Sequence, residues 1–207
     1  MNSWNGTSAT LLAVAATVAA ARGSRGRKAN YDGPPVAHTG GFGEPTCRAC
    51  HQDEPLNAPG GSLRIEGLPR RYEPGRAYML TVVLRRSGMG RAGFELSTRV
   101  ADGQEAGSQA GVLEARDARA SVVPGPPPKT VQYAEQTREG CSVSGPETRW
   151  VLRWQSPAAA AGDVLIHVAA NAANYDDSPL GDFIYVGEWR VSGGGARASG
   201  SSRSRGR

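Results

Sequence analysis

Cysteine, histidine and methionine are scarce in this chain, whose 207 residues contain three of each. Aromatic residues account for 6% of the chain, and no apolar run reaches the ~20 residues that a membrane-spanning helix needs. Amphipathic segments of helical length are also missing, which excludes an alternation of strands and helices. Because the chain has so few cysteines and histidines, a cluster of them carries information about function.

The net charge of +5 comes from the two ends of the chain. Residues 22–28 and 197–207 hold eight of the 24 Lys and Arg residues and no acidic residue. Residues 29–192 carry 16 basic and 19 acidic groups, a net charge of −3. A mildly acidic body offers no broad basic face for phosphates, so we expect no nucleic-acid partner.

The apolar run over residues 9–21 (ATLLAVAATVAAA) has about the length of a secretory h-region and ends in small residues. We predict a signal peptide over residues 1–21 and an exported protein, periplasmic or at the cell surface. The alternative is an Ala-rich leader with no targeting role. No transmembrane segment is expected apart from this leader. Residues 22–35 are predicted to be a flexible linker, and residues 193–207 a disordered Arg/Ser/Gly tail.

Five runs rich in β-branched, apolar and aromatic residues predict strands. They cover residues 78–84, 92–100, 150–154, 164–170 and 183–191. The 28 glycines and 14 prolines favour turns and short strands over long helices. The spacing of the runs predicts an all-β sandwich over residues 61–192. The proline-rich run 124–128 cannot lie in a central strand and is expected at the surface.

The motif CxxCH occurs once, at residues 47–51. In a c-type haem site, two thiols form thioethers with the porphyrin vinyl groups and the following imidazole binds iron. The pattern therefore predicts one covalent haem c, attached to Cys47 and Cys50, with His51 as the proximal iron ligand. We assign residues 36–60 to a segment that carries this haem motif.

Other chemistry would also use this pair of cysteines. In an oxidising compartment Cys47 and Cys50 can form a disulfide. A structural zinc site needs four ligands, and the sequence offers no second cysteine pair. Cys141 is expected to be an unpaired loop cysteine, although a bridge to Cys47 or Cys50 would prevent double haem attachment. No acid/base constellation accompanies the motif, so we expect no enzymatic activity.

The second axial ligand of the iron has four candidates in the sequence. His38 is favoured because it lies close to the motif, in a glycine-rich stretch that could fold back across the haem. His167 alternates with apolar residues, as a histidine of the core or surface does. Met79 lies in an apolar run and is expected in the core, and Met89 is available in principle.

Several motifs resemble those of bacterial exported proteins with a reelin-domain-like module, known as choice-of-anchor V proteins. Between residues 36 and 191 they are HTGGFGEPTCRACH, GLPRRYEPGRAYMLTVVL, MGRAGFELSTRVADG, WVLRWQSP and VAANAANYDDSPLGDFIY. The resemblance implies an immunoglobulin-like (reelin-domain-like) β-sandwich, preceded by a short cysteine-containing segment and exported. Gln136 stands where that family often has a histidine.

Taken together, these patterns predict an exported, non-enzymatic c-type haem protein. Its expected role is electron transfer or redox sensing, with a β-sandwich as the scaffold and a redox partner or surface ligand that the sequence does not identify. The alternative is an extracellular or surface-bound binding or adhesion module, in which the CxxC pair forms a disulfide or a metal site.

Overall fold

The computed structural model describes residues 30–128, 130–159 and 161–193. The predicted signal peptide, most of the predicted linker and nearly all of the predicted tail lie outside the described residues, so these remain predictions. Within the described part of the chain, no helix is long and apolar enough to cross a membrane.

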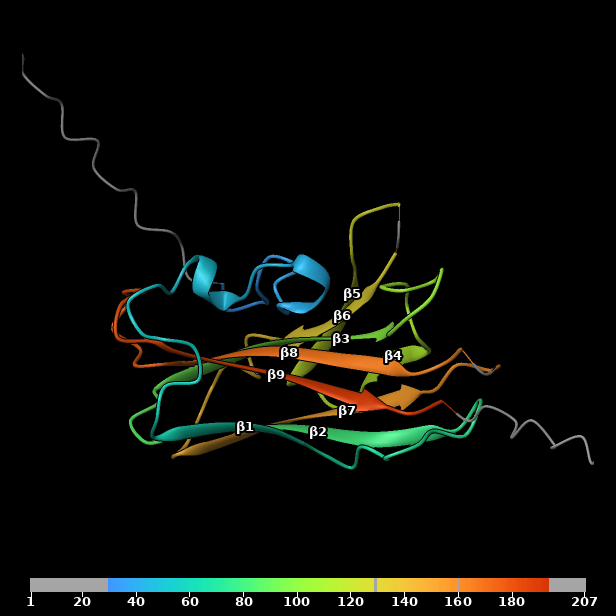
Figure 1. Ribbon diagram of the computed structural model, residues 1–207. Coiled ribbons are helices and arrows are strands. Elements are labelled where there is room, and N and C mark those ends of the chain that lie inside the picture. The colour runs from blue at the N-terminus through green and yellow to red at the C-terminus, as the bar shows by residue number, and fades with distance from the viewer. Residues whose placement is uncertain (1–29, 129, 160, 194–207) are drawn as a thin grey trace, which may run out of the picture.

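Two antiparallel sheets, packed face to face, form the body of the protein (Figure 1). The order in the four-stranded sheet is β1 (Gly61–Glu66), β2 (Ala77–Arg86), β7 (Glu147–Gln155) and β4 (Val112–Ala115). The order in the five-stranded sheet is β5 (Ala120–Pro124), β6 (Gln132–Gln136), β3 (Arg91–Val100), β8 (Val164–Ala173) and β9 (Phe183–Val191). Two 3-10 turns, η1 (Gly41–Gly43) and η2 (Cys47–Ala49), precede the strands. The predicted all-β sandwich is confirmed.

All five predicted strands are present, as β2, β3, β7, β8 and β9. The other four strands were not predicted. Strand β4 has only four residues, and β6 (QYAEQ) lacks an apolar alternation, so neither produces a clear pattern. Pro124 is exposed and is the last residue of β5. Because β5 is an edge strand, a proline without an N–H group is tolerated there.

The core between the sheets is built from alternate residues of the long strands. Trp150 is fully buried, and its ring stacks on Phe94 with ring centroids 4.5 Å apart. The expectation that Met79 belongs to the core is wrong, because its side chain is 50% exposed. Successive strand residues point to opposite faces, so with Leu80 fully buried Met79 points to solvent.

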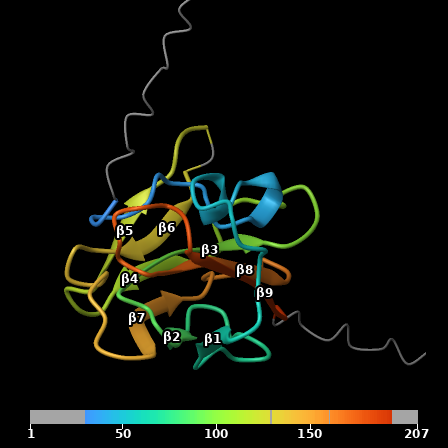
Figure 2. The ribbon, with the colours of Figure 1, turned by 90° about the vertical axis from the view of Figure 1, so that its left-hand side faces the viewer.

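Residues 30–60 are here called the covering segment. The part with η1 and η2 lies on the outer face of the five-stranded sheet, and the end of the segment runs past the edge of β9 to β1 (Figures 1 and 2). Strand β3 is consequently buried on both faces from Phe94 to its end, whereas one face of an uncovered antiparallel sheet meets water. Asn57 ties the segment to the edge of β9: its N–H donates to Ile184 O, and its Oδ1 accepts from Val186 N–H, both at 2.9 Å.

The covering segment needs a glycine where it crosses β8. A Cβ atom on Gly41 would lie 2.4 Å from Cγ of His167, well inside van der Waals contact. The absence of a side chain at Gly41 therefore lets η1 lie directly on the imidazole of His167 in β8. Part of the predicted linker also contacts the sandwich, because Asn30 O accepts a hydrogen bond from Gln136 Nε2.

Candidate functional site

The CxxCH residues form a capped turn within the covering segment. The Thr46 side chain accepts a hydrogen bond from Arg48 N–H, and Cys47 O accepts from the N–H groups of Cys50 and His51, both at 3.1 Å. Side chains three residues apart in a 3-10 turn lie one above the other. The turn therefore brings the side chains of Cys47 and Cys50 to one side, with His51 immediately after them.

The Cys47 side chain faces the sheet. The residue is half-buried, and desolvation of the thiol, with a further contribution from the nearby Glu95 carboxylate, raises the pKa of Cys47 to about 12. The thiolate is the nucleophilic form of cysteine, and a raised pKa lowers the fraction of Cys47 in that form at neutral pH.

Cys141 lies in the loop between β6 and β7, as a buried free thiol. Its Sγ donates a hydrogen bond to Arg138 O at 3.0 Å. The expectation of an unpaired loop cysteine is confirmed, and Cys141 forms no bridge to the motif.

His51 is held by a buried carboxylate. Its Nδ1 lies 2.7 Å from Oδ2 of Asp182, whose side chain is 2% exposed, and the other oxygen of Asp182 accepts from Asn174 N–H at 3.1 Å. The amide nitrogen of Asn171 is 3.3 Å from Nε2 of His51. A proton on Nδ1, shared with Asp182, leaves the lone pair of this ring on Nε2.

Sequence reasoning missed Asp182 and Asn171. Asn171 lies on the outer face of β8, and Asp182 immediately precedes β9. Both are far from the motif along the chain, and each stands among ordinary turn or strand residues. No local pattern could have linked them to His51, because the pairing of β8 with β9 brings Asn171 and Asp182 together and the covering segment places His51 beside them.

His38, the favoured distal ligand, is anchored to the sheet through its backbone. Its N–H donates to Oε2 of Glu95 at 2.5 Å, and its ring Nδ1 is 3.2 Å from Val36 O. Its role as a ligand remains a prediction.

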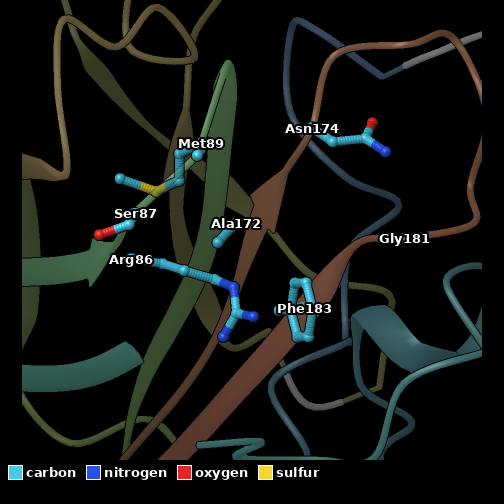
Figure 3. A pocket seen from close by; sticks show the side chains of 8 residues that line it. Arg86, Ser87, Met89, Ala172, Asn174, Gly181 and Phe183 are labelled. Atoms are coloured by element: carbon cyan, nitrogen blue, oxygen red, sulfur yellow. The ribbon is translucent and has the colours of Figure 1, made fainter. Parts of the chain in front are cut away.

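Met79 and Met89, the sulfur candidates, lie elsewhere. Met79 belongs to the four-stranded sheet. Met89 lines a pocket of about 40 Å³ at one end of the sandwich, in which the guanidinium of Arg86 lies 3.1 Å from the ring centre of Phe183 (Figure 3). This space holds a few water molecules at most and is too small for a prosthetic group.

A buried ion pair fastens the covering segment to the sheet. The Glu44 carboxylate accepts hydrogen bonds from Arg99, Tyr133 and Thr39. Burial alone would raise the pKa of Glu44, but these three donors outweigh burial and lower the pKa below its usual value. Glu44 is therefore ionised at neutral pH, opposite the nearly inaccessible Arg99.

Two further carboxyl groups lie under the segment, and neither forms an ion pair with a cationic side chain of the described residues. Glu95 and Glu135 are directly opposite in the register of β3 and β6, and they are 0% and 5% exposed. Burial raises the pKa of Glu95 to about 8 and that of Glu135 to about 7. One oxygen of each has no hydrogen-bond partner among the described residues. Both groups therefore favour the protonated form near neutral pH.

A larger pocket, of about 370 Å³, opens between the covering segment and strands β8 and β9. Its size falls within the range of small-molecule and cofactor sites. The covering segment contributes Thr39, Gly40, Thr46 and Leu56, and the strands contribute His167, Val186, Gly187 and Glu188.

His167 is the histidine in the wall of this pocket. Its side chain is 8% exposed, and its Nε2 lies 2.8 Å from Oε2 of Glu188. Its Nδ1 is buried and has no hydrogen-bond partner among the described residues. The ring of Phe42 meets the imidazole edge to face, with ring centroids 5.4 Å apart.

In the part of the chain that the structure describes, no three His, Cys, Asp or Glu side chains gather as ligands for a metal ion. The motif places a single imidazole, with the Asp182 carboxylate at its Nδ1, immediately after two cysteines.

No protein-family model and no curated protein matches the chain. Among solved structures, the chain is similar to the reeler domain of human F-spondin, with 20% identity over 67% of this chain and 93% of that one, and a TM-score of 0.42. It is also similar to a Reelin-N domain of F-spondin (20% identity, 70% and 94% covered, TM-score 0.43). A cohesin module from Clostridium perfringens is similar at 9% identity, 64% and 94% covered, and a TM-score of 0.39. Similarities of this size assign neither family nor function.

Proposed function

We propose that this protein is an exported haem protein that carries one haem c on Cys47 and Cys50, with His51 as the proximal ligand, and that it acts in electron transfer or redox sensing. The observation that carries the proposal is the folded CxxCH turn, in which His51 follows the cysteine pair and Asp182 holds its Nδ1. Bound haem would supply a one-electron redox centre.

The donor set fits this group. Histidines that bind metals through one ring nitrogen commonly donate the other N–H to a carboxylate, and the buried Asp182 supplies that acceptor. Asn171 is the polar neighbour of Nε2, so its amide must turn aside when Nε2 binds iron. The two cysteines lie on one side of the same turn, as attachment to a single porphyrin edge requires.

The attachment proposal is tested by expression with a c-type maturation system. Denatured wild-type protein should keep haem staining and a mass increment of one haem, and Cys50→Ser should lose double attachment because one thioether is missing. Cys141→Ser is the matched control and should keep the haem, since Cys141 takes no part in the motif. A colourless wild-type chain two hydrogens light would instead indicate a disulfide and favour a surface binding module.

Asp182 should lower the reduction potential of the bound iron. A hydrogen bond from Nδ1 to a buried carboxylate makes the imidazole a stronger donor, which stabilises the oxidised iron. In Asp182→Asn the reduction equilibrium should shift about tenfold toward the reduced form, which is about 59 mV for one electron. Spectroelectrochemical titration measures this, with the exposed Asp177→Asn of the same loop as the control. Equal potentials in wild type and Asp182→Asn would refute the role of Asp182.

We also propose that the chain belongs with the exported reelin-domain-like, choice-of-anchor V proteins. Its support is the ordered succession of sequence motifs between residues 36 and 191, together with the observed β-sandwich behind a cysteine-containing segment. Fractionation of cells that express the full chain tests the export that this membership implies.

A further inference from the structure

We infer that residues 30–51, the part of the covering segment that lies on the five-stranded sheet, open from the sandwich as one unit while the sandwich stays folded. This opening controls access of solvent and reagents to the thiol of Cys47. The inference goes beyond the proposed function, because it concerns the chain with free cysteines that the structure describes. Three observations support it: the polar atoms beneath residues 30–51, the few apolar contacts of these residues, and the tether at Asn57.

The outer face of the five-stranded sheet holds polar atoms without partners. In the described residues, seven buried side-chain nitrogen and oxygen atoms have no hydrogen-bond partner. All seven belong to residues of this outer face, because these residues alternate along their strands with residues of the core. The atoms are Arg91 Nε, Glu95 Oε1, Ser97 Oγ, Arg99 Nε, Glu135 Oε2, His167 Nδ1 and Asn171 Oδ1.

Residues 30–51 cover several of these groups. Gly41 lies on the ring of His167, and the imidazole of His51 contacts the amide of Asn171. Polar groups in protein interiors normally have partners, and burial without a partner costs free energy. When residues 30–51 lift from the sheet, water reaches these groups. Their hydration therefore favours the open state and weakens the docking of the segment.

The docked segment has little apolar contact with the sandwich. No described residue of the covering segment belongs to the hydrophobic cluster between the sheets, and the ring of Phe42 is 43% exposed. Its polar contacts with the sheet include those of Glu44 with Arg99, His38 N–H with Glu95, and His51 with Asp182. Such contacts exchange for contacts with water at a small net cost, whereas unfolding of the sandwich exposes its whole apolar core. Residues 30–51 therefore open more readily than the sandwich unfolds.

Asn57 tethers the end of the covering segment to the sandwich. Its main-chain N–H donates to Ile184 O, and its side-chain Oδ1 accepts from Val186 N–H, so it takes the place of a neighbouring strand at the edge of β9. This attachment lies downstream of residues 30–51. These residues can therefore swing away from the sheet while the chain stays attached at Asn57.

Two cysteines report the two events separately. Cys47 is half-buried in η2, which packs on β8, and its thiol lies near the carboxyl group of Glu95 beneath it. Cys141 is buried in the sandwich, where its Sγ donates to Arg138 O. Opening of residues 30–51 exposes Cys47 and leaves Cys141 covered, whereas unfolding of the sandwich exposes both.

The experiment measures the labelling of single thiols by Ellman's reagent. The full chain is expressed without a c-type maturation system and keeps either Cys47 or Cys141, with its other two cysteines replaced by serine. Cys47 should react roughly 100-fold faster than Cys141, and roughly 100-fold more slowly than the same thiol in the urea-unfolded chain. Equal rates for Cys47 and Cys141 would overturn the inference, because the segment would then leave the sheet only when the sandwich unfolds. Labelling of Cys47 at the rate of the unfolded chain would overturn it too, because the closed state would be missing.

Gly41→Ala identifies the contact that closes the segment. The added Cβ would lie 2.4 Å from Cγ of His167, so it should hold the segment off the sheet and speed the labelling of Cys47 about tenfold. The rate for Cys141 should not change. In a His167→Ala background the clash is absent, and Gly41→Ala should then have little effect. No acceleration by Gly41→Ala, or equal acceleration of both thiols, would contradict the inference.

Hydrogen exchange of the wild-type chain needs no substitution. Backbone amides of residues 38–51 should exchange at rates that low urea leaves unchanged, whereas those of β8 should follow the unfolding of the sandwich. If the two regions exchange together, residues 30–51 are not a separate unit. None of these measurements involves haem, so the inference and the proposed function fail independently of each other.

Discussion

At pH 9, the Glu95→Gln variant is expected to unfold with a free energy roughly 3–5 kcal/mol larger than that of the wild type. Glu95 is fully buried, and burial raises its pKa from 4.5 to about 8 in the folded protein. At a pH between these two pKa values, Glu95 keeps its proton in the folded state and has lost it in the unfolded state. The wild type therefore loses stability as the pH rises from about 4.5 to 8, whereas an amide has no proton to lose.

Urea unfolding of both proteins at pH 4 and pH 9 measures this difference. At pH 4 the two should have similar stability, because the carboxyl group is protonated in both states, and the carbonyl of glutamine can accept the His38 N–H as Glu95 does. Glu139→Gln, at an exposed position, is the control and should follow the wild type at both values. Parallel pH curves for wild type and Glu95→Gln would contradict the prediction.

Trp150→Ala is expected to lower the free energy of unfolding by about 3–5 kcal/mol. Its ring is fully buried between the sheets against Phe94, so truncation removes apolar contacts and leaves a cavity. Its Nε1 donates to Gly140 O at 3.0 Å, and the alanine variant also leaves that buried carbonyl without this donor. A loss of this size is a large share of the 5–15 kcal/mol that stabilises a typical domain.

Trp150→Phe separates the two contributions. It keeps an aromatic ring in the core and loses only the donor and part of the volume, so it should be clearly more stable than Trp150→Ala. Urea unfolding followed by circular dichroism gives both free energies. Equal stability of the two variants would show that packing of the ring contributes little at this position.

The fold could be predicted only in outline from local patterns. The strands with long apolar or alternating runs were recognisable, and the turn residues between them indicated a sandwich. Met79 was misplaced because an apolar run alone does not reveal which face of a strand is buried. Strands β4, β5 and β6 were missed because they are short, and their pairing depends on partners distant in the chain.

The candidate site, like the fold, could be predicted only in part from the sequence. The sequence by itself was enough to propose the attachment motif, because the chemistry expected of Cys47, Cys50 and His51 requires only five consecutive residues. Only the tertiary structure decided that the covering segment lies on the five-stranded sheet, that Asp182 holds His51, and that His167 borders a pocket beside Thr46. These contacts join residues that are far apart in the chain, so they depend on the packing of the whole sandwich and leave no trace in local sequence.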